Sequence, residues 1–263
     1  MDLGLTGKVV AVAAASKGIG KAIAFRLAEE GALLGVCSRD LASIQRTADE
    51  IQSQTGAQVL AIEADLTQAA AAENFVNTTA EKFGGLDALV CNAGGPPAGT
   101  FADFDDTAWD AAFQLTLMSV VRLCRTAIPH FQNRGGGRVV NVSSFSVKQP
   151  VDNLILSNSI RMSAIGLFKS LSNEYGADNI TFNTVCPGFT QTERLEQLFQ
   201  HRAETLNVPS DTLKNQAAET VSMKRLGDPQ ELADLAALLC SNCSRYITGT
   251  AIQVDGGATK GYV

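Results

Sequence analysis

The segment that most constrains the fold is residues 9–20, VVAVAAASKGIG, in which an apolar run leads into a turn of small residues. Gly18 and Gly20 close this turn, and an amphipathic stretch, KAIAFRLAEEG, follows it. A strand, a glycine turn and a helix in this order can bind phosphate, because unpaired N–H groups at the helix N-terminus attract anions and glycine lets a phosphate approach the backbone. The segment therefore predicts nucleotide binding. The alternative is that the glycines only permit a tight turn.

The end of the next apolar run, LLGVCSRD, indicates which nucleotide is preferred. In dinucleotide-binding folds, an acidic residue at this place contacts the adenosine ribose of NAD. This chain has Ser38 followed by Arg39, which leaves room for a 2′-phosphate and offers a guanidinium to bind it. Lys17, inside the glycine turn, adds a second cation. We predict a preference for NADP(H) over NAD(H), with two solvated surface cations as the alternative.

Length and charge exclude several classes of protein. The 263 residues suffice for one large domain, residues 1–263, with a buried core. The formal net charge is −6 and there is no basic run, which argues against a nucleic-acid partner. No stretch approaches the roughly 18 consecutive apolar residues of a membrane span, and the first ten residues do not resemble a signal peptide. We expect a cytoplasmic protein that binds neither nucleic acid nor membrane.

The cysteines and histidines do not suggest a metal site or a hydrolase. Six cysteines are spread through apolar segments, which predicts reduced thiols in the core. Cys240 and Cys243 are near each other but lack a second pair of ligands, so we predict no metal. His130 and His201 are the only histidines, and neither has nearby partners for a catalytic triad.

Apolar runs alternate with amphipathic stretches along the whole chain, which predicts an α/β fold: a doubly wound parallel sheet with helices on both faces. Asp228, Pro229 and Glu231 match the N-cap, the first-turn proline and the capping-box acid of a late helix. After the first strand and helix, further strands are expected at 33–37, 58–62, 86–91, 138–142, 180–185 and 250–254, and helices at about 40–54, 68–83, 106–133 and 157–175.

Six short motifs, in their order and spacing, resemble those of the short-chain dehydrogenase/reductase family over essentially the whole chain. The resemblance implies a single Rossmann-type domain, a nicotinamide cofactor, and a homotetramer or homodimer assembled through the helices near 110–133 and 157–175. The motifs are Ser16-Lys17-Gly18-Ile19-Gly20, Asp65-Leu66, Asn92-Ala93-Gly94, Asn141-Val142-Ser143-Ser144, Pro187-Gly188 with Thr192, and Val254-Asp255-Gly256-Gly257.

The resemblance also implies how the cofactor lies. Asp65 and Leu66 would contact adenine, the Asn92 to Gly94 segment the ribose and nicotinamide, and the Pro187 to Thr192 segment the carboxamide. Ala14 stands where the family's turn has its first glycine. The predicted cofactor-binding residues are Ala14, Ser16, Lys17, Gly18, Ile19, Gly20, Ser38, Arg39, Asp65, Leu66, Asn92, Ala93, Gly94, Pro187, Gly188, Thr190 and Thr192.

The catalytic residues depart from the family pattern. The family uses a tyrosine to transfer the substrate's proton, a lysine four residues later, a serine that binds the substrate oxygen, and a helical asparagine. Ser144 matches the serine, but the tyrosine position holds Ser157, the lysine position Arg161 and the asparagine position Thr116. A serine hydroxyl is a far weaker acid than a phenol, and a guanidinium can hold and polarise a group but stays protonated.

Lys148 is the remaining candidate for a proton donor, since it lies four residues beyond Ser144 at the carboxyl end of a predicted strand. The alternative is an exposed loop lysine. The predicted catalytic set is therefore Ser144, Lys148, Ser157 and Arg161.

Residues 189–225 stand where the family has its variable substrate lid, and their apolar and charged residues fit either closure over a moderately hydrophobic substrate or completion of the core. The leading functional prediction is an NADP(H)-dependent oxidoreductase that reduces a small-molecule carbonyl compound at a rebuilt site. The alternatives are a cofactor-binding protein without hydride transfer, acting as a partner subunit or sensor, and a non-redox reaction on the same fold.

Overall fold

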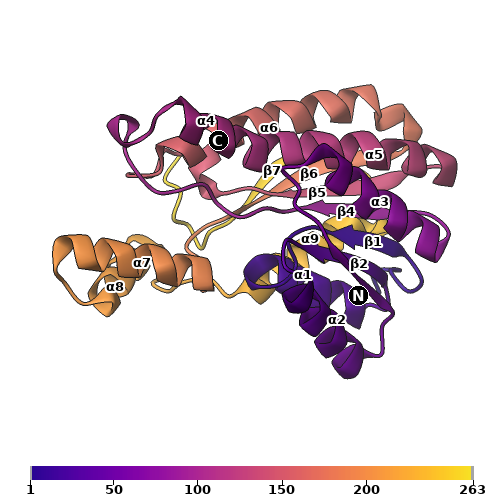
Figure 1. Ribbon diagram of the computed structural model, residues 1–263, viewed down its shortest axis with the longest axis horizontal. Coiled ribbons are helices and arrows are strands. Elements are labelled where there is room, and N and C mark those ends of the chain that lie inside the picture. Colours follow the sequence, from indigo (N-terminus) through magenta and orange to yellow (C-terminus); the bar gives the residue numbers. More distant parts are fainter. Residues whose placement is uncertain (1, 262–263) are drawn as a thin grey trace.

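The fold is built on a seven-stranded sheet with the strand order β3-β2-β1-β4-β5-β6-β7, in a computed structural model that describes residues 2–261 (Figure 1). Every neighbouring pair of strands is parallel, which confirms the predicted doubly wound α/β fold. The strands are β1 (Val9–Val12), β2 (Leu33–Ser38), β3 (Val59–Glu63), β4 (Ala88–Cys91), β5 (Gly137–Val142), β6 (Ile180–Pro187) and β7 (Ala251–Val254).

Helices cover both faces of the sheet. In Figure 1, α1, α2 and α9 lie on one side, and α3, α5 and α6 on the other. The helices are α1 (Gly18–Glu29), α2 (Leu41–Thr55), α3 (Ala69–Phe83), α4 (Asp106–Phe113), α5 (Ser119–Arg134), α6 (Ile155–Glu174), α7 (Glu193–Leu206), α8 (Ser210–Thr220) and α9 (Pro229–Cys240).

Side chains alternate between the two faces of the sheet along the central strands, so the core has two layers. Val10 and Val12 pack with residues of α1, α2 and α9, whereas Val9 and Ala11 pack with residues of α3 and α5. Successive strand residues point to opposite faces, so the fully apolar run VVAV satisfies both layers.

The predicted start of α9 is confirmed. Asp228 and Glu231 form a capping box around Pro229 at the start of α9. Gly84 ends α3 in the left-handed conformation, with φ of 77°. These short-range signals work because the bonds that they predict are local to the chain.

The predicted helix 106–133 is not uniform, because a π-helical turn, Gln114–Met118, separates α4 from α5. The Ser119 hydroxyl donates to the Leu115 carbonyl at 2.6 Å within this turn. A π turn widens the helix by one residue and is frequent at functional sites. Here it places Leu115 at the cleft described below.

Helices α7 and α8 project away from the sheet (Figure 1). They pack on each other through Phe199, Ala203 and Leu213. This excursion leaves and rejoins the rest of the chain at a single isolated parallel bridge, Thr190 with Gly227.

Helical segment Asp106–Arg134 is long and apolar enough to cross a membrane by length and composition alone. Of its most apolar window, 44% is buried inside the protein. A buried core helix passes the same test, so the finding is weak support for a membrane span.

Five cysteines are buried as predicted, but Cys243 is exposed, so the core assignment was wrong for that residue. Cys243 lies in a short 3-10 turn after α9, where the chain returns to the surface. Burial raises the pKa of the Cys37 and Cys240 thiols to about 12, so both stay protonated. Within residues 2–261, no group of three or more His, Cys, Asp or Glu side chains could hold a metal ion.

Candidate functional site

A cleft of about 990 Å³ runs along the carboxyl ends of the parallel strands, the edge at which doubly wound sheets bind ligands. All the predicted cofactor-binding residues line it, and so do Ser144, Ser157 and Arg161 of the predicted catalytic set. These residues come from segments far apart in the sequence, and the parallel strands bring them to one place. Their roles in binding and catalysis remain predictions.

Close approach of the backbone explains the glycine turn. A Cβ atom on Gly20 would collide with the Ala14 carbonyl oxygen and lie 2.6 Å from the Asn92 side-chain nitrogen. That nitrogen donates to the carbonyls of Ala13 (3.3 Å) and Ala14 (3.2 Å), joining the end of β4 to the turn. Ala14 has a φ of 49°, a left-handed conformation that favours glycine. Ala14 thus adopts a backbone conformation that glycine would take without strain.

The N-terminus of α1 fits the phosphates of a dinucleotide. Its N-cap residue, Lys17, forms no side-chain cap, and its first turn contains no acidic residue. Helix α1 therefore presents unpaired N–H groups and a partial positive charge to the cleft. Gly18, at φ of 55°, keeps the approach open.

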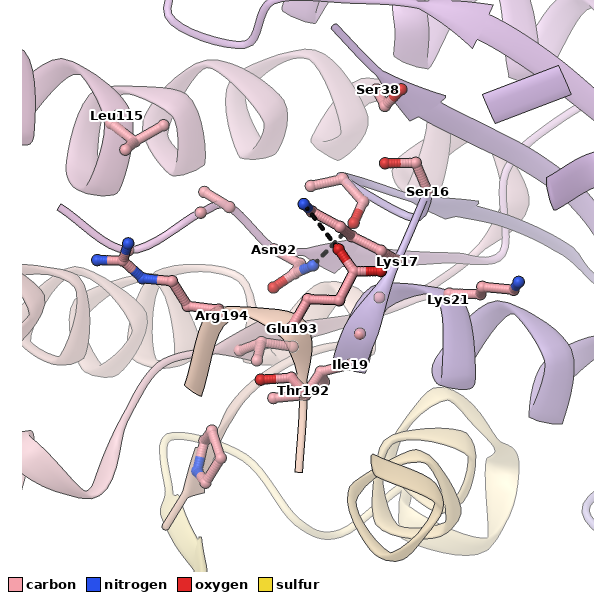
Figure 2. Close-up of a pocket in the computed structure, with 18 of the residues that line it drawn as sticks. Ser16, Lys17, Ile19, Lys21, Ser38, Asn92, Leu115, Thr192, Glu193 and Arg194 are labelled. Carbon is pink, nitrogen blue, oxygen red and sulfur yellow. Dashed lines mark hydrogen bonds and ion pairs between the residues drawn. The ribbon is translucent and has the colours of Figure 1, made fainter. Parts of the chain in front are cut away.

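The Glu193 side chain lies over this turn in the close-up of the cleft (Figure 2). Its carboxylate pairs with the Lys17 ammonium at 3.0 Å, linking the start of α7 to the glycine turn. Both side chains are more than half exposed, so the pair is screened by water. A carboxylate at this place repels a phosphate and occupies the cation that would bind it.

We therefore expect Glu193→Gln to raise the affinity for NADP(H) by about two- to fivefold. A fluorescence titration of the nucleotide at low salt would measure it. Glu204→Gln, on the same helix but outside the set of residues that line the cleft, is the matched control. Weaker binding by Glu193→Gln would instead show that the carboxylate helps to bind the nucleotide.

The far end of the cleft contains one more cationic side chain than the sequence predicted. Arg39 is exposed there, and Arg46 of α2 lines the same space, with its guanidinium donating to the Ser43 hydroxyl at 2.9 Å. The Ser38 hydroxyl donates to the Asp40 carbonyl at 2.8 Å. Sequence reasoning missed Arg46, although α2 begins at this strand end and its second turn necessarily lies nearby.

Local hydrogen bonds hold the middle of the cleft in shape. An Asp65 carboxylate oxygen accepts from the backbone N–H (3.0 Å) and the hydroxyl (2.8 Å) of Thr67. Thr192 is the N-cap of α7 and accepts from the Leu195 N–H at 3.2 Å. A Cβ atom on Gly188 would lie 2.7 Å from the Asp255 backbone, so a glycine is required where β6 leaves the sheet.

The predicted catalytic serines form a short chain. The Ser144 hydroxyl accepts from the Ser146 N–H at 3.1 Å, which leaves its own hydrogen available to the cleft. The Ser146 hydroxyl lies 3.3 Å from that of Ser157, which is buried on α6. Ser157 is thus bonded to a neighbouring serine, whereas Ser144 faces the ligand space.

Arg161 lies one helical turn after Ser157, and its guanidinium is anchored by one nitrogen. Nη1 donates to the carbonyls of Ser143 (3.2 Å) and Val142 (3.4 Å) at the end of β5. The pKa of this guanidinium is lowered to about 10, mainly because burial removes water from the charge; Cys186 opposes this shift and the like charge of Arg194 adds to it. Arg161 therefore remains a cation at neutral pH.

A small cavity of about 10 Å³ lies behind Arg161 and has roughly the size of one water molecule. Arg161, Thr116 and Ser143 line it. Within residues 2–261, Arg161 Nε, Thr116 Oγ1 and Ser143 Oγ have no hydrogen-bond partner. One water could join these three groups, because each of them can form a hydrogen bond.

Lys148 is not among the residues that line the cleft. It is partly buried, just beyond a single 3-10 turn, Phe145–Val147, and its charge lowers the pKa of the Cys186 thiol against the larger, opposite effect of burial. The turn carries Lys148 past the strand end at which Ser144 lines the cleft.

Arg194 lines the cleft and was missed by sequence reasoning. It follows Thr192 and Glu193 at the start of α7, and its Nη2 donates to the Pro96 carbonyl at 2.8 Å. The available signal was an arginine two residues after a predicted cofactor contact, but its place in the cleft depends on a loop nearly a hundred residues earlier.

Comparisons with known proteins agree with this geometry. A family model described as enoyl-(acyl carrier protein) reductase matches residues 13–259. Dehydrogenase/reductase SDR family member 4 of Oryctolagus cuniculus is 32% identical over 255 residues, which cover 97% of this chain and 94% of the relative. Oxidoreductase UcpA of Escherichia coli (strain K12) is 34% identical over 257 residues, which cover 97% and 95%.

The fold also matches solved structures. L-sorbose reductase from Gluconobacter frateurii, complexed with NADPH and L-sorbose, superposes with a TM-score of 0.94 at 30% identity and covers 99% of this chain and 100% of its own. The match therefore covers nearly the whole chain. The chain belongs to the short-chain dehydrogenase/reductase family of NAD(P)-dependent oxidoreductases.

Proposed function

We propose that this protein is an NADP(H)-dependent oxidoreductase that reduces a carbonyl compound at a site rebuilt around Ser144 and Arg161. The observation that carries the proposal is that the glycine turn, the Ser38–Arg39 strand end and these two residues all line one cleft. The cleft thus joins a nucleotide-sized groove to a hydrogen-bond donor and a fixed cation. The NADPH-bound relative of the same fold supports the choice of cofactor.

Different residues would bind the cofactor and act on the substrate. The N-terminus of α1 would hold the diphosphate, and Arg39, with Arg46 beside it, the 2′-phosphate. When bound, the reduced nicotinamide supplies a hydride, so that the carbonyl carbon gains the hydride, its oxygen gains a proton and the nicotinamide is oxidised. Ser144 donates a hydrogen bond to the carbonyl oxygen, and the Arg161 charge stabilises the negative charge that develops there.

The proton comes from Lys148 or from water. Because Lys148 does not line the cleft and Arg161 stays protonated, we favour water that enters through the open side of the cleft. Lys148→Ala decides between them: unchanged turnover assigns the proton to water, and lost turnover with intact NADPH binding assigns it to Lys148.

The first experiment is a fluorescence titration with NADPH and NADH, followed on the same sample by NADPH oxidation against ketones, 3-oxoacyl thioesters and quinones. Binding with turnover supports the reductase. Tight binding without turnover on the whole panel would support the cofactor-binding role or a non-redox reaction, in keeping with the buried, serine-bonded Ser157. Absence of binding to either nucleotide would contradict the proposal.

We expect Arg39→Asp to weaken NADPH binding by about ten- to hundredfold and NADH binding far less, because only NADPH carries the 2′-phosphate. The two dissociation constants would be measured in parallel at fixed salt. Arg202→Asp, an exposed position on α7, controls for the change in net charge. Equal loss of both nucleotides would overturn the 2′-phosphate assignment.

We also propose that the protein acts in the cytoplasm as a homodimer or homotetramer joined through residues 110–133, at the end of α4 and in α5, and through α6. Phe113, at the end of α4, and Met162, on α6, are large apolar side chains that are 41% and 47% exposed. Burying them against a second copy would remove apolar surface from water. Sedimentation equilibrium tests the assembly, and a monomer at micromolar concentration would contradict it.

A further inference from the structure

Two arginines from different elements meet at one end of the cleft. Arg161 comes from α6 and Arg194 from the first turn of α7. Both border the backbone of Gly95: a Cβ atom there would lie 3.6 Å from Arg194 Nε and 4.0 Å from Arg161 Nη2. The two charges are close enough for Arg194 to lower the pKa of Arg161, after the larger effect of burial. Two cations therefore share one small region.

No carboxylate balances these charges. Among residues 2–261, neither arginine forms an ion pair. The acidic residues that line the cleft all have other partners: Asp40 with Ser43, Glu50 with Lys21, Asp65 with Thr67, and Glu193 with Lys17.

The unbalanced pair is unfavourable in the free protein. Arg161 is partly buried and Arg194 is exposed, and desolvation lowers the pKa of both guanidiniums. Like charges held close together destabilise each other, and a bound anion relieves this repulsion. Arg161 Nη1 and Arg194 Nη2 are engaged with backbone carbonyls, so both planar groups are fixed before a ligand arrives.

The pair lies apart from the places expected for the cofactor's phosphates. Figure 2 shows Arg194 directed toward Leu115, away from Ser16, Lys17 and Ser38. Those three residues mark the diphosphate turn and the 2′-phosphate end, so Arg194 is beyond both. The anion that this pair suits therefore belongs to another ligand.

Apolar side chains surround the same end of the cleft and define the rest of that ligand. They come from three separate parts of the fold: the π turn, the residue before α6 and the first two turns of α7. They are Leu115, Leu154, Leu195 and Leu198.

We propose that the substrate is an oxo acid with a short apolar chain, whose carboxylate is bound by Arg161 and Arg194 while Ser144 holds the carbonyl oxygen. This inference rests on the proposed reductase function for the carbonyl, but the carboxylate site stands on the arginine pair alone. A carboxylate accepts charge-assisted hydrogen bonds from guanidinium groups, and Arg161 Nη2, which no carbonyl of residues 2–261 engages, faces the Gly95 position together with Arg194 Nε.

The test uses probes that bind but cannot be reduced. Hexanoate and hexanamide, which have the same chain with and without charge, would be titrated by calorimetry into the NADPH-loaded protein. We expect hexanoate to bind at least about tenfold more tightly than hexanamide, and Arg194→Met to remove this difference without changing NADPH affinity. Arg202→Met, an exposed position on the same helix, should behave like the parent protein.

The other possible outcomes contradict either the carboxylate site or the reductase proposal. Equal affinity for hexanoate and hexanamide removes the carboxylate site. If Arg194→Met weakens NADPH binding as much as it weakens hexanoate binding, the arginine belongs to the cofactor site instead. Reduction of uncharged ketones as efficiently as of 3-oxo acids overturns the inference and leaves the reductase proposal standing. Selective hexanoate binding with no reduction of any carbonyl compound supports the site and overturns the reductase proposal.

Discussion

Ser144→Ala is expected to lower kcat for NADPH-dependent carbonyl reduction by about 10²- to 10³-fold, because it removes a fixed donor to the oxygen on which negative charge develops. The Ser146 N–H occupies one acceptor position of the Ser144 hydroxyl, which leaves the hydroxyl hydrogen available to a ligand. Steady-state kinetics and a nucleotide titration on the same sample would separate turnover from binding. The dissociation constant for NADPH should stay within about twofold of the parent value, because the lost donor serves the substrate oxygen.

Ser146→Ala is the matched control. It removes a buried hydroxyl two residues away that bonds to Ser157 and does not line the cleft. Its backbone N–H still donates to Ser144, so kcat should change little while stability falls by about 1 kcal/mol. If Ser146→Ala lowered kcat as much as Ser144→Ala does, the serines would act by shaping the loop rather than by contact with substrate.

Gly20→Ala is expected to destabilise the protein by about 1–3 kcal/mol, which corresponds to a fall in Tm of about 3–10 °C. The added Cβ would meet the Ala14 carbonyl oxygen and the Asn92 side chain. Neither neighbour can move freely, since the first is backbone and the second is hydrogen-bonded to that backbone. The glycine turn must shift, so we also expect NADPH affinity to fall by tenfold or more.

Gly176→Ala, after α6, provides the comparison for stability. No atom lies within 4 Å of a Cβ at that position, and the change should alter the free energy of unfolding by no more than about 0.5 kcal/mol. Thermal unfolding and a nucleotide titration of both variants would measure these effects. Normal stability and NADPH affinity in Gly20→Ala would mean that the turn has more room than the structure gives it.

Local sequence signals predicted the fold well because each depends on neighbouring residues. The alternation of apolar runs with amphipathic stretches is enough to predict a parallel sheet, and Asp228 with Glu231 marks a helix start through bonds within one turn. The π turn left no such signal. Residues 114–118, QLTLM, contain no glycine or proline, and the turn depends on packing between α4, α6 and the loop after β4.

Candidate site residues were predictable where they follow a strand, because parallel strands end at one edge. Residues whose place depends on a turn or on packing between distant segments could not be predicted in this way. Lys148 is near Ser144 in sequence, but one 3-10 turn separates it from the cleft. Arg194 is far from Arg161 in sequence, and the meeting of the two depends on how α7 packs against the Gly95–Pro96 loop.

The single bridge at Thr190 and Gly227 has an evolutionary consequence. Two backbone hydrogen bonds of 2.8 Å, between Gln191 N–H and the Gly227 carbonyl and between Gly227 N–H and the Phe189 carbonyl, fix where the α7–α8 excursion begins and ends. Because the two ends are held together, a longer, shorter or unrelated insert there would add little closure entropy and leave the sheet intact. The part of this excursion beyond Thr192 can thus be exchanged largely as one cassette, which allows new substrate ranges to arise by recombination while Thr192 and the rest of the nucleotide groove are retained.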